Sequence, residues 1–474
     1  MKSIARVVAV LVFMGGTLLN AQVPHFKHII IVVQENRTPD NMFQGLCTPP
    51  YGRSTSCSTK PGPRQYNIQT SQWLDMSKAR HYTDPLPVDL LAPYDLDHSH
   101  WAFGLMCDNL ATLNSPCKMD GGSRLGCFGT CPTQPVYRYV DNSTGALNPY
   151  LEIATRYGFA NYMFQTNQGP SFPAHLFLFA GTSAPTAEDD AAAIFASSNA
   201  PHGLMIGCTA DMNTTVLLVE PPHKEKDTIY PCFDVQTMGD FQQTFSWRYY
   251  APNGISIWNA PTAISHICQS NGYNGQCLGA DYVNNVDLRP ADVLTDIAGC
   301  HLRDVSWVNP SGENSDHAGF GAGGGPSWVA SIVNAVGASN KCDGGGGYWN
   351  DTAIFITWDD WGGWYDHEPP TLLSYPQGDY QYGFRVPLLV VSAYTPAGYI
   401  DNQRYDFGSI LRFVQQNFGL RQGVLGFADA RATTDLTSFF NAASGPRPYQ
   451  FIVSPKDANF FINDTSPQRD PDDY

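Results

Sequence analysis

The chain has 474 residues, of which 15% are charged and 13% aromatic, with 43 glycines and 35 prolines. This composition excludes an intrinsically disordered chain and predicts a large core with many structured loops. The formal net charge of -16 excludes an extended nucleic-acid-binding surface, because phosphate backbones require clustered Lys and Arg side chains.

The amino terminus has the features of a secretory signal. Lys2 and Arg6 precede the apolar stretch VVAVLVFMGGTLL, which ends at the small and polar residues Asn20 and Ala21. We predict a signal peptide over residues 1–21 and a secreted or periplasmic protein. An uncleaved membrane anchor is the alternative, and it is disfavoured because the apolar run is shorter than the ~20 residues that a span needs. We expect at most transient contact with a membrane surface.

In chain order, the first predicted element is a buried strand in the run HIIIVVQEN, which ends at Glu35 and Asn36. A polar and cysteine-rich stretch of about residues 45–148 follows. The later expected elements alternate between helices and strands. They are helices at 149–158, after Ser171, at 327–337 and at 409–419, and strands at 159–164, 214–220, 303–308, 352–358 and 387–394.

This alternation predicts an α/β fold with a mainly parallel central sheet and helices on both of its faces. We expect one catalytic domain over residues 22–474, with insertions near 45–148 and 221–300. The 12 cysteines lie mostly beside Gly, Pro and Ser, which predicts disulfides that staple these insertions in an oxidising compartment. Zinc ligation by Cys127 and Cys131 is the competing interpretation.

Two acidic pairs end apolar runs that lie more than three hundred residues apart. Glu35-Asn36 closes the first run, and Asp359-Asp360 closes TAIFITWDD. Short apolar runs are typical of buried parallel strands, whose carboxyl ends meet at the edge of the sheet where ligands bind. Hard oxygen ligands gathered there predict one divalent cation, with Mg, Ca or Mn favoured over Zn.

Ser171 lies just ahead of the apolar helical run in NQGPSFPAHLFLFAG. Pro173 is expected at an early helical position, so Ser171 or Phe172 should lie at the cap. Unpaired N–H groups and the helix dipole there favour a bound phosphate and a developing alkoxide, although most such serines are only caps. His175, within the same helix, is equally consistent with core packing and with lining a site.

Several histidines lie in loops beside aspartates. They are His317 in SDHAGFG, His367 in WYDHEPP, and His98 and His100 in DLDHSHW. A carboxylate that orients such a ring lets its other nitrogen hold a phosphoryl oxygen or protonate a leaving group. Each of them, taken alone, is equally consistent with a surface or structural histidine.

The ordered motifs resemble a bacterial phosphoesterase family that includes secreted phospholipases C and an acid phosphatase on an alkaline-phosphatase-like fold. VQENRTPDNMF, GPSFPAHLFLFAG and ITWDDWGGWYDHEPP carry the resemblance, and VSWVNPSGENSDHAG, CKMDGG, YGFRVPLLVVSAY and SILRFVQQNFG extend it over nearly the whole mature chain. Three positions depart from the family pattern: Thr38-Pro39 replaces Ser-Phe, Phe407-Gly408 replaces an expected His, and Trp361 stands where a His is frequent.

The resemblance implies a metal site at Glu35, Asn36, Asp359 and Asp360 and a nucleophile at Ser171. We expect the cation also to bind the Ser171 oxygen and lower its pKa. Ser171 then attacks phosphorus to give a phosphoseryl intermediate, while the catalytic histidines hold phosphoryl oxygens or protonate the leaving alkoxide. These histidines are His98, His317 and His367.

The expected partner is a phosphoester substrate, either a phospholipid or a small phosphomonoester. An aromatic surface for a choline headgroup would favour a phospholipid, and one set of side chains has the right composition for it. Packing around the acidic loop is the other interpretation of this set: Trp358, Trp361, Trp364 and Tyr365. A non-catalytic secreted protein that binds a structural calcium ion is the alternative function, and it leaves the placement of Ser171 unexplained.

Overall fold

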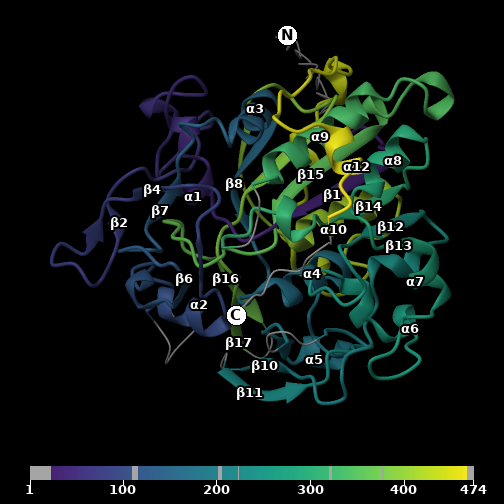
Figure 1. Ribbon diagram of the computed structural model, residues 1–474, viewed down its shortest axis with the longest axis horizontal. Coiled ribbons are helices and arrows are strands. Elements are labelled where there is room, and N and C mark those ends of the chain that lie inside the picture. Colours follow the sequence, from purple (N-terminus) through teal and green to yellow (C-terminus); the bar gives the residue numbers. More distant parts are fainter. Residues whose placement is uncertain are drawn as a thin grey trace, which may run out of the picture.

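The computed structural model describes residues 23–108, 116–200, 205–221, 224–319, 323–375 and 378–466 (Figure 1). The predicted signal peptide, residues 1–21, lies outside these ranges. Within them, no helix combines the length and the apolar character needed to cross a membrane.

An eight-stranded sheet forms the centre of the fold, in the order β13-β12-β14-β1-β15-β18-β8-β19. Its strands span Val286–Asp287 (β13), Trp247–Tyr250 (β12), Val305–Val308 (β14), His28–Gln34 (β1), Thr352–Trp358 (β15), Leu388–Ser392 (β18), Gly158–Phe164 (β8) and Tyr399–Asp406 (β19). Strand β18 pairs antiparallel with both of its neighbours, whereas the other pairs in the sheet are parallel. The predicted mainly parallel sheet is confirmed.

Strands β1 and β15 lie side by side in the middle of this sheet (Figure 1). They pair along their whole length, from His28 opposite Thr352 to Gln34 opposite Trp358. Every residue of both strands is buried, which explains their almost purely apolar composition. The acidic pairs that follow the two strands therefore leave the sheet together.

Helices cover both faces of the sheet, as predicted. Phe355 packs against Phe413 of α10 (Phe407–Asn417), whereas Trp358 packs against Tyr150 of α3 (Asn148–Arg156), with ring centroids 5.1 Å apart in each pair. Side chains three positions apart on a strand point to opposite faces. Helix α4 (Ser171–Ala180) lies with α10, and α9 (Gly325–Ala338) lies with α3. Beyond α10, Gly419 has the predicted left-handed conformation, with φ of 72°.

The remaining helices are short. They span Pro39–Met42 (α1), His100–Met106 (α2), Ala187–Ala191 (α5), Ser265–Cys268 (α6), Ala280–Asn285 (α7), Asp292–Ala298 (α8), Ala428–Arg431 (α11) and Ala458–Ile462 (α12).

The segment 45–148 forms small two-stranded sheets outside the central one, on the left of Figure 1. They pair Trp73–Leu74 (β2) with Tyr82–Thr83 (β3), Leu86–Val88 (β4) with Arg138–Val140 (β7), and Tyr94–Leu96 (β5) with Cys127–Gly129 (β6). Leu372–Tyr375 (β16) and Gly378–Gln381 (β17) form a further hairpin.

The segment 221–300 differs from the prediction of an insertion, because it adds β12 and β13 to one edge of the central sheet. Conversely, the strand expected at 214–220 lies in a separate antiparallel sheet, in which Val216–Glu220 (β10) pairs with Phe195–Ala196 (β9) and Lys224–Ile229 (β11). The hydrophobic pattern of the sequence does not reveal these two strands, because β12 is short and aromatic and β13 has only 2 residues, so neither forms an apolar run.

All twelve cysteines are paired in disulfides, which confirms the prediction of stapled loops. The pairs are Cys47–Cys57, Cys107–Cys117, Cys127–Cys131, Cys208–Cys232, Cys268–Cys277 and Cys300–Cys342. Because Cys127 and Cys131 bond each other, the competing zinc interpretation is wrong.

Candidate active site

The two acidic pairs meet at the carboxyl edge of the central sheet. Backbone pairing continues past the strands: Asp359 N donates to Gln34 O and Arg37 N donates to Asp360 O, both at 3.0 Å. The side chains of Glu35, Asn36, Asp359 and Asp360 are fully buried. The structure thus brings together the four residues that the sequence proposed as metal ligands.

Asn36 has a left-handed backbone, with φ of 59°. This conformation is uncommon outside glycine and is best tolerated by Asn and Asp. It lets Asn36 N donate to Asp359 Oδ1 at 3.0 Å. Gly362 packs on the other side of this turn, where a Cβ would come within 2.3 Å of Asn36 O. The close approach of the two segments therefore requires glycine at position 362.

Ser171 is the first residue of α4, and Pro170 before it offers no side-chain cap. The helix cap thus lies one residue earlier than the sequence suggested. Ser171 Oγ lies 3.4 Å from both Glu35 Oε2 and Asp360 Oδ2. The hydroxyl therefore combines a helix N-terminus with contacts to both acidic pairs.

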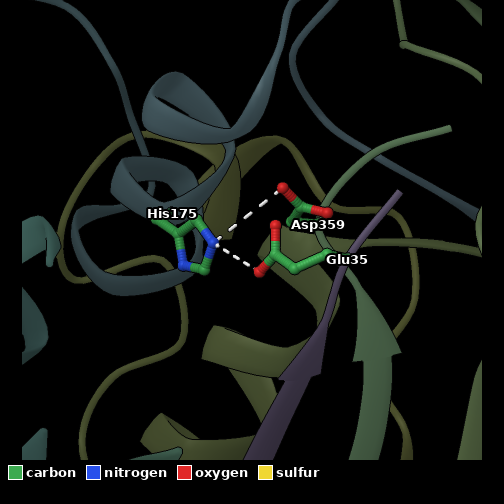
Figure 2. A group of neighbouring side chains, drawn as sticks. All are labelled: Glu35, His175 and Asp359. Atoms are coloured by element: carbon green, nitrogen blue, oxygen red, sulfur yellow. Dashed lines mark hydrogen bonds and ion pairs between the residues drawn. The ribbon is translucent and has the colours of Figure 1, made fainter. Parts of the chain in front are cut away.

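His175 follows Ser171 by one helical turn and points toward Glu35 and Asp359 (Figure 2). Its Nε2 lies 3.2 Å from Glu35 Oε1 and 3.9 Å from Asp359 Oδ2. The sequence left His175 open between core packing and lining the site, and the structure shows that it lines the site. The spacing of four residues from Ser171 was the available signal. We call Glu35, Asn36, Ser171, His175, Asp359 and Asp360 the Ser171 cluster.

The donor atoms of this cluster fit a divalent cation. Glu35, His175 and Asp359 each offer a ligand atom, and these atoms lie within 4.8 Å of one another. Asn36 Oδ1 and Asp359 Oδ2 are buried and accept no hydrogen bond from any described residue. Three buried carboxylates at one point are costly unless a cation joins them. The imidazole adds a nitrogen ligand, which widens the fit from Mg, Ca and Mn toward Zn.

His98 contacts Asn36, and His317 packs against His98. His98 Nδ1 donates to Leu96 O at 2.6 Å, which leaves Nε2 to accept from Asn36 Nδ2 at 3.3 Å. The rings of His98 and His317 pack edge to face with centroids 6.1 Å apart, and His317 Nδ1 donates to Ala318 O. His100 instead begins α2 and stacks on Phe103. Of the two alternatives in DLDHSHW, His98 is therefore the one that contacts the Ser171 cluster.

His367 does not join this group, contrary to the sequence prediction. Its Nδ1 lies 2.7 Å from Asp40 Oδ2 and its Nε2 lies 2.9 Å from the Asn67 side chain. Arg385 binds Asp366 through two hydrogen bonds of 2.9 Å and lies 3.3 Å from Asp40 Oδ1. We call Asp40, Asp366, His367 and Arg385 the Arg385 cluster. Burial raises the pKa of Asp366 to about 6, although Arg385 acts in the opposite direction.

The aromatic side chains considered for a choline surface are all buried: Trp358, Trp361, Trp364 and Tyr365. Trp361 packs on Phe384, and Trp358 Nε1 donates to Asp316 Oδ2 at 3.0 Å. Of the two interpretations that the sequence left open, packing is therefore the correct one.

The sequence profile of the phosphoesterase family matches residues 26–421, which is most of the chain. The chain belongs to the phosphoesterase family. This membership confirms the resemblance seen in the sequence motifs.

Individual relatives match over shorter stretches. Non-hemolytic phospholipase C of Pseudomonas aeruginosa is 27% identical over 34% of this chain and 27% of its own length. Phospholipase C B of Mycobacterium tuberculosis is 30% identical over 43% of this chain and 42% of its own length. The chain thus covers well under two thirds of either relative.

A solved structure of an alkaline phosphatase superfamily protein from Vibrio parahaemolyticus aligns with 60% of this chain and 63% of that chain. Its TM-score is 0.33 at 10% identity. Similarity at this level does not bear on substrate or mechanism.

Proposed function

We propose that the chain is an exported, metal-dependent phosphoester hydrolase that acts through Ser171. One observation carries the proposal: the Ser171 hydroxyl, at the start of α4, lies 3.4 Å from a carboxylate of each acidic pair. A serine that only caps a helix has no reason to contact two buried carboxylates. Family membership supports the same reaction class.

Glu35, Asn36, Asp359 and Asp360 would hold the cation, with His175 as a further ligand. When bound, a divalent cation supplies positive charge that lowers the pKa of a nearby hydroxyl and neutralises phosphoryl oxygens. His175 Nε2 lies 3.2 Å from Glu35 Oε1 and 3.9 Å from Asp359 Oδ2, so the imidazole nitrogen and the two carboxylates would be able to hold the same cation.

Ser171 performs the nucleophilic step. Its Oγ forms a bond to phosphorus while the bond to the leaving alkoxide breaks, and the serine proton passes to a neighbouring carboxylate such as Glu35. A water oxygen then bonds to phosphorus while the Ser171 Oγ–P bond breaks, the carboxylate returns its proton to Oγ, and the phosphate product leaves with the oxygen of the water. Phe172 N donates to Asn199 Oδ1 at 2.9 Å and Pro173 has no N–H, so the start of α4 would stabilise phosphoryl oxygens through the helix dipole instead of through a set of N–H donors.

His98 and His317 handle protons and phosphoryl oxygens on the side of Asn36. The hydrogen bond from His98 Nδ1 to Leu96 O fixes the tautomer, so Nε2 accepts from Asn36 Nδ2 and leaves Asn36 Oδ1 for the cation. His367 acts indirectly, by holding Asp40 within the Arg385 cluster.

A phosphodiester of the phospholipid type is the first substrate to test, since the named relatives are phospholipases C. Trp358, Trp361, Trp364 and Tyr365 are buried, so they do not form an exposed surface for a choline headgroup. A small phosphomonoester is therefore the second substrate to test in the same assay. The six disulfides support export to an oxidising compartment.

Hydrolysis of p-nitrophenyl phosphate and p-nitrophenylphosphorylcholine, with and without EDTA, tests the proposal. We expect one substrate to be turned over, EDTA to stop the reaction, and Ser171→Ala to lower turnover by at least about 10³-fold with an unchanged melting temperature. Acid quenching with ³²P-labelled substrate should trap label on the wild type and not on Ser171→Ala.

Thr182→Ser is a matched control, since Thr182 is a buried hydroxyl just beyond the end of the same helix. It should keep turnover close to that of the wild type. Activity retained by Ser171→Ala would overturn the nucleophile. Calcium binding without hydrolysis of either ester would instead support the non-catalytic calcium-binding protein.

A further inference from the structure

A large groove lies on the segment that forms the first insertion. Its volume is about 960 Å³, near the upper end of the roughly 300–1,000 Å³ of small-molecule sites. Its walls come from residues within 44–59, 68–72 and 139–148. No residue of the Ser171 cluster or of the Arg385 cluster lines it, so the groove is distinct from the proposed catalytic site.

The lining is polar but nearly uncharged. Asp141 is the one charged side chain among the lining residues, which include no Lys, Arg, His or Glu. Its carboxylate is engaged in its own turn, where it accepts from Ser143 N at 3.1 Å and from Ser143 Oγ at 2.6 Å. Anions such as phosphate are bound by Arg and Lys, and cations by carboxylates or aromatic cages. Neither kind of ligand fits these walls.

Most of the lining offers hydroxyl and amide groups. A set of threonine and serine hydroxyls in the walls makes no hydrogen bond to any other described residue. They belong to Thr48, Ser54, Thr59, Thr70, Ser71 and Thr144. The walls also contain the amides of Gln44, Gln69 and Gln72, the rings of Tyr51 and Tyr139, and apolar residues such as Pro49, Pro50 and Ile68. Hydroxyls both donate and accept, and tyrosine rings offer apolar faces with a polar tip.

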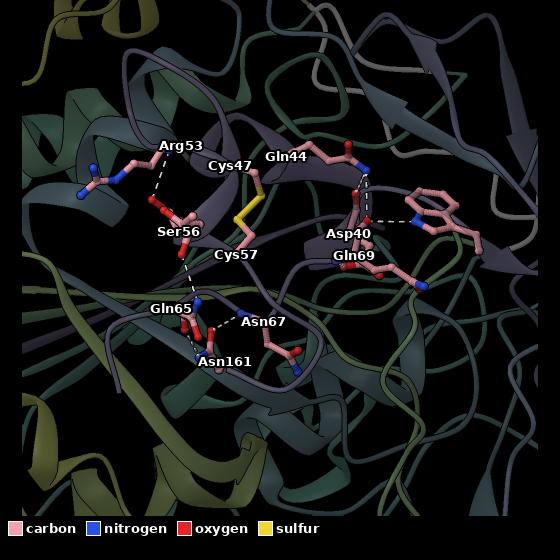
Figure 3. Close-up of a disulfide and its surroundings, with 12 residues drawn as sticks. Asp40, Gln44, Cys47, Arg53, Ser56, Cys57, Gln65, Asn67, Gln69 and Asn161 are labelled. Atoms are coloured by element: carbon pink, nitrogen blue, oxygen red, sulfur yellow. Dashed lines mark hydrogen bonds between the residues drawn. A yellow bond between two sulfur atoms is a disulfide. The ribbon is translucent and has the colours of Figure 1, made fainter. Parts of the chain in front are cut away.

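The groove is held rigid by cross-links in its own walls. The Cys47–Cys57 disulfide closes one loop, as Figure 3 shows. Gln69 N donates to Asp40 Oδ1 at 2.9 Å, and Gln44 Nε2 approaches Gln69 O at 3.4 Å. A preformed wall lowers the entropic cost of binding, so weak individual hydrogen bonds can sum to a useful affinity.

We propose that this groove binds a neutral oligosaccharide. Sugar hydroxyls alternate as donors and acceptors and match the hydroxyl and amide walls, and sugar rings present C–H faces to tyrosine. The volume admits more than one sugar ring, and the missing charges reject phosphorylated, acidic and amine-bearing sugars. Such binding would hold the protein on glycan-bearing material while the Ser171 cluster acts independently.

Titration calorimetry of the full mature chain tests this with tetrasaccharides of glucose, mannose and N-acetylglucosamine. Tetragalacturonic acid and tetraglucosamine serve as the charged probes. We expect at least one neutral probe to bind with a Kd below about 1 mM and the charged probes to bind at least tenfold more weakly. Thr70→Trp fills the groove from an exposed lining position and should weaken binding at least tenfold.

Thr55→Trp is the matched control, because Thr55 is exposed in the disulfide loop and does not line the groove. It should bind the neutral probe as the wild type does. Ser171→Ala should also retain binding, so failure of the proposed hydrolysis would not affect this result. Absence of binding by every neutral probe, tighter binding of a charged probe, or equal binding by Thr70→Trp would overturn the proposal.

Discussion

The acids of the Ser171 cluster and of the Arg385 cluster come from the same two segments, 35–40 and 359–367, and the two clusters differ in their source of positive charge. In the Arg385 cluster, the guanidinium forms two hydrogen bonds with Asp366 and a third with Asp40. In the Ser171 cluster, three carboxylates face a serine and a histidine. The acids of the Arg385 cluster thus stabilise the fold, because an arginine of the chain neutralises them. The acids of the Ser171 cluster have no such arginine and are available to bind a metal cation.

Spacing alone does not separate the two clusters. Asp40, Asp366 and His367 place their ligand atoms within 4.8 Å of one another, as Glu35, His175 and Asp359 do. The arginine already occupies the position that a metal would take between Asp40 and Asp366.

Removing the guanidinium should have the largest effect. Arg385→Met leaves Asp40 and Asp366 buried without their cation and should lower the free energy of unfolding by about 3–5 kcal/mol, measured by urea denaturation. The control is Arg404→Met, since Arg404 pairs with Glu368 in a half-exposed position and should cost less than about 1 kcal/mol. Equal losses in the two variants would contradict the role given to Arg385.

The corresponding change in the Ser171 cluster should act on rate instead of stability. Asp359→Asn should lower turnover at least about 100-fold, or about 2.7 kcal/mol in activation free energy. It should leave the metal-free protein as stable as before or more stable, because it removes one of three buried like charges. Steady-state kinetics and urea unfolding in EDTA measure both quantities. A stability loss like that of Arg385→Met would remove the distinction between the clusters.

His175 should set affinity for the cation. His175→Gln keeps a polar side chain but removes the imidazole, and it should weaken Zn²⁺ or Mn²⁺ binding by about 10-fold while changing Mg²⁺ binding less. Metal titration calorimetry of EDTA-treated protein gives the constants. His266→Gln, on a partly exposed histidine paired with Asp240, is the control. Identical metal affinities in His175→Gln and the wild type would show that His175 only packs.

The last prediction concerns pH. The pKa of Asp366 is raised from 3.8 to about 6 in the folded chain, so between these values the folded state binds more protons than the unfolded state. The stability contributed by Asp366 therefore falls as pH rises from about 4 to about 6 and then levels off. Unfolding free energies measured from pH 4 to 7 should show this fall in the wild type and a smaller one in Asp366→Asn. Profiles that stay parallel would refute the assignment to Asp366.

The central sheet and its acidic edge were predictable because their signals are local. Each apolar run predicts a buried strand, and the polar residues that close it, Glu35-Asn36 or Asp359-Asp360, mark the carboxyl end of that strand. Ser171 was equally visible, since a proline early in an apolar helix marks the helix start.

Other site features depend on contacts that no local pattern encodes. Asp366-His367 resembles an oriented catalytic pair, and only the fold shows that Asp40 and Asn67 engage the ring. Arg385 lies alone in the run YGFRVP, so nothing nearby in the sequence marks it as the partner of two buried acids. The short aromatic strand β12 likewise gains its place in the sheet from tertiary pairing with β14.

The reversed direction of β18 explains how Arg385 reaches its acids. Leu388, the first residue of β18, lies opposite Thr357 near the carboxyl end of β15, so the chain just before β18 passes the edge where the acidic segments emerge. A strand running with its neighbours would begin at the far edge, about 17 Å away for five residues, beyond the reach of any side chain. The one antiparallel strand of the sheet thus places Arg385 at the carboxyl edge, where the parallel strands β1 and β15 place their acidic residues.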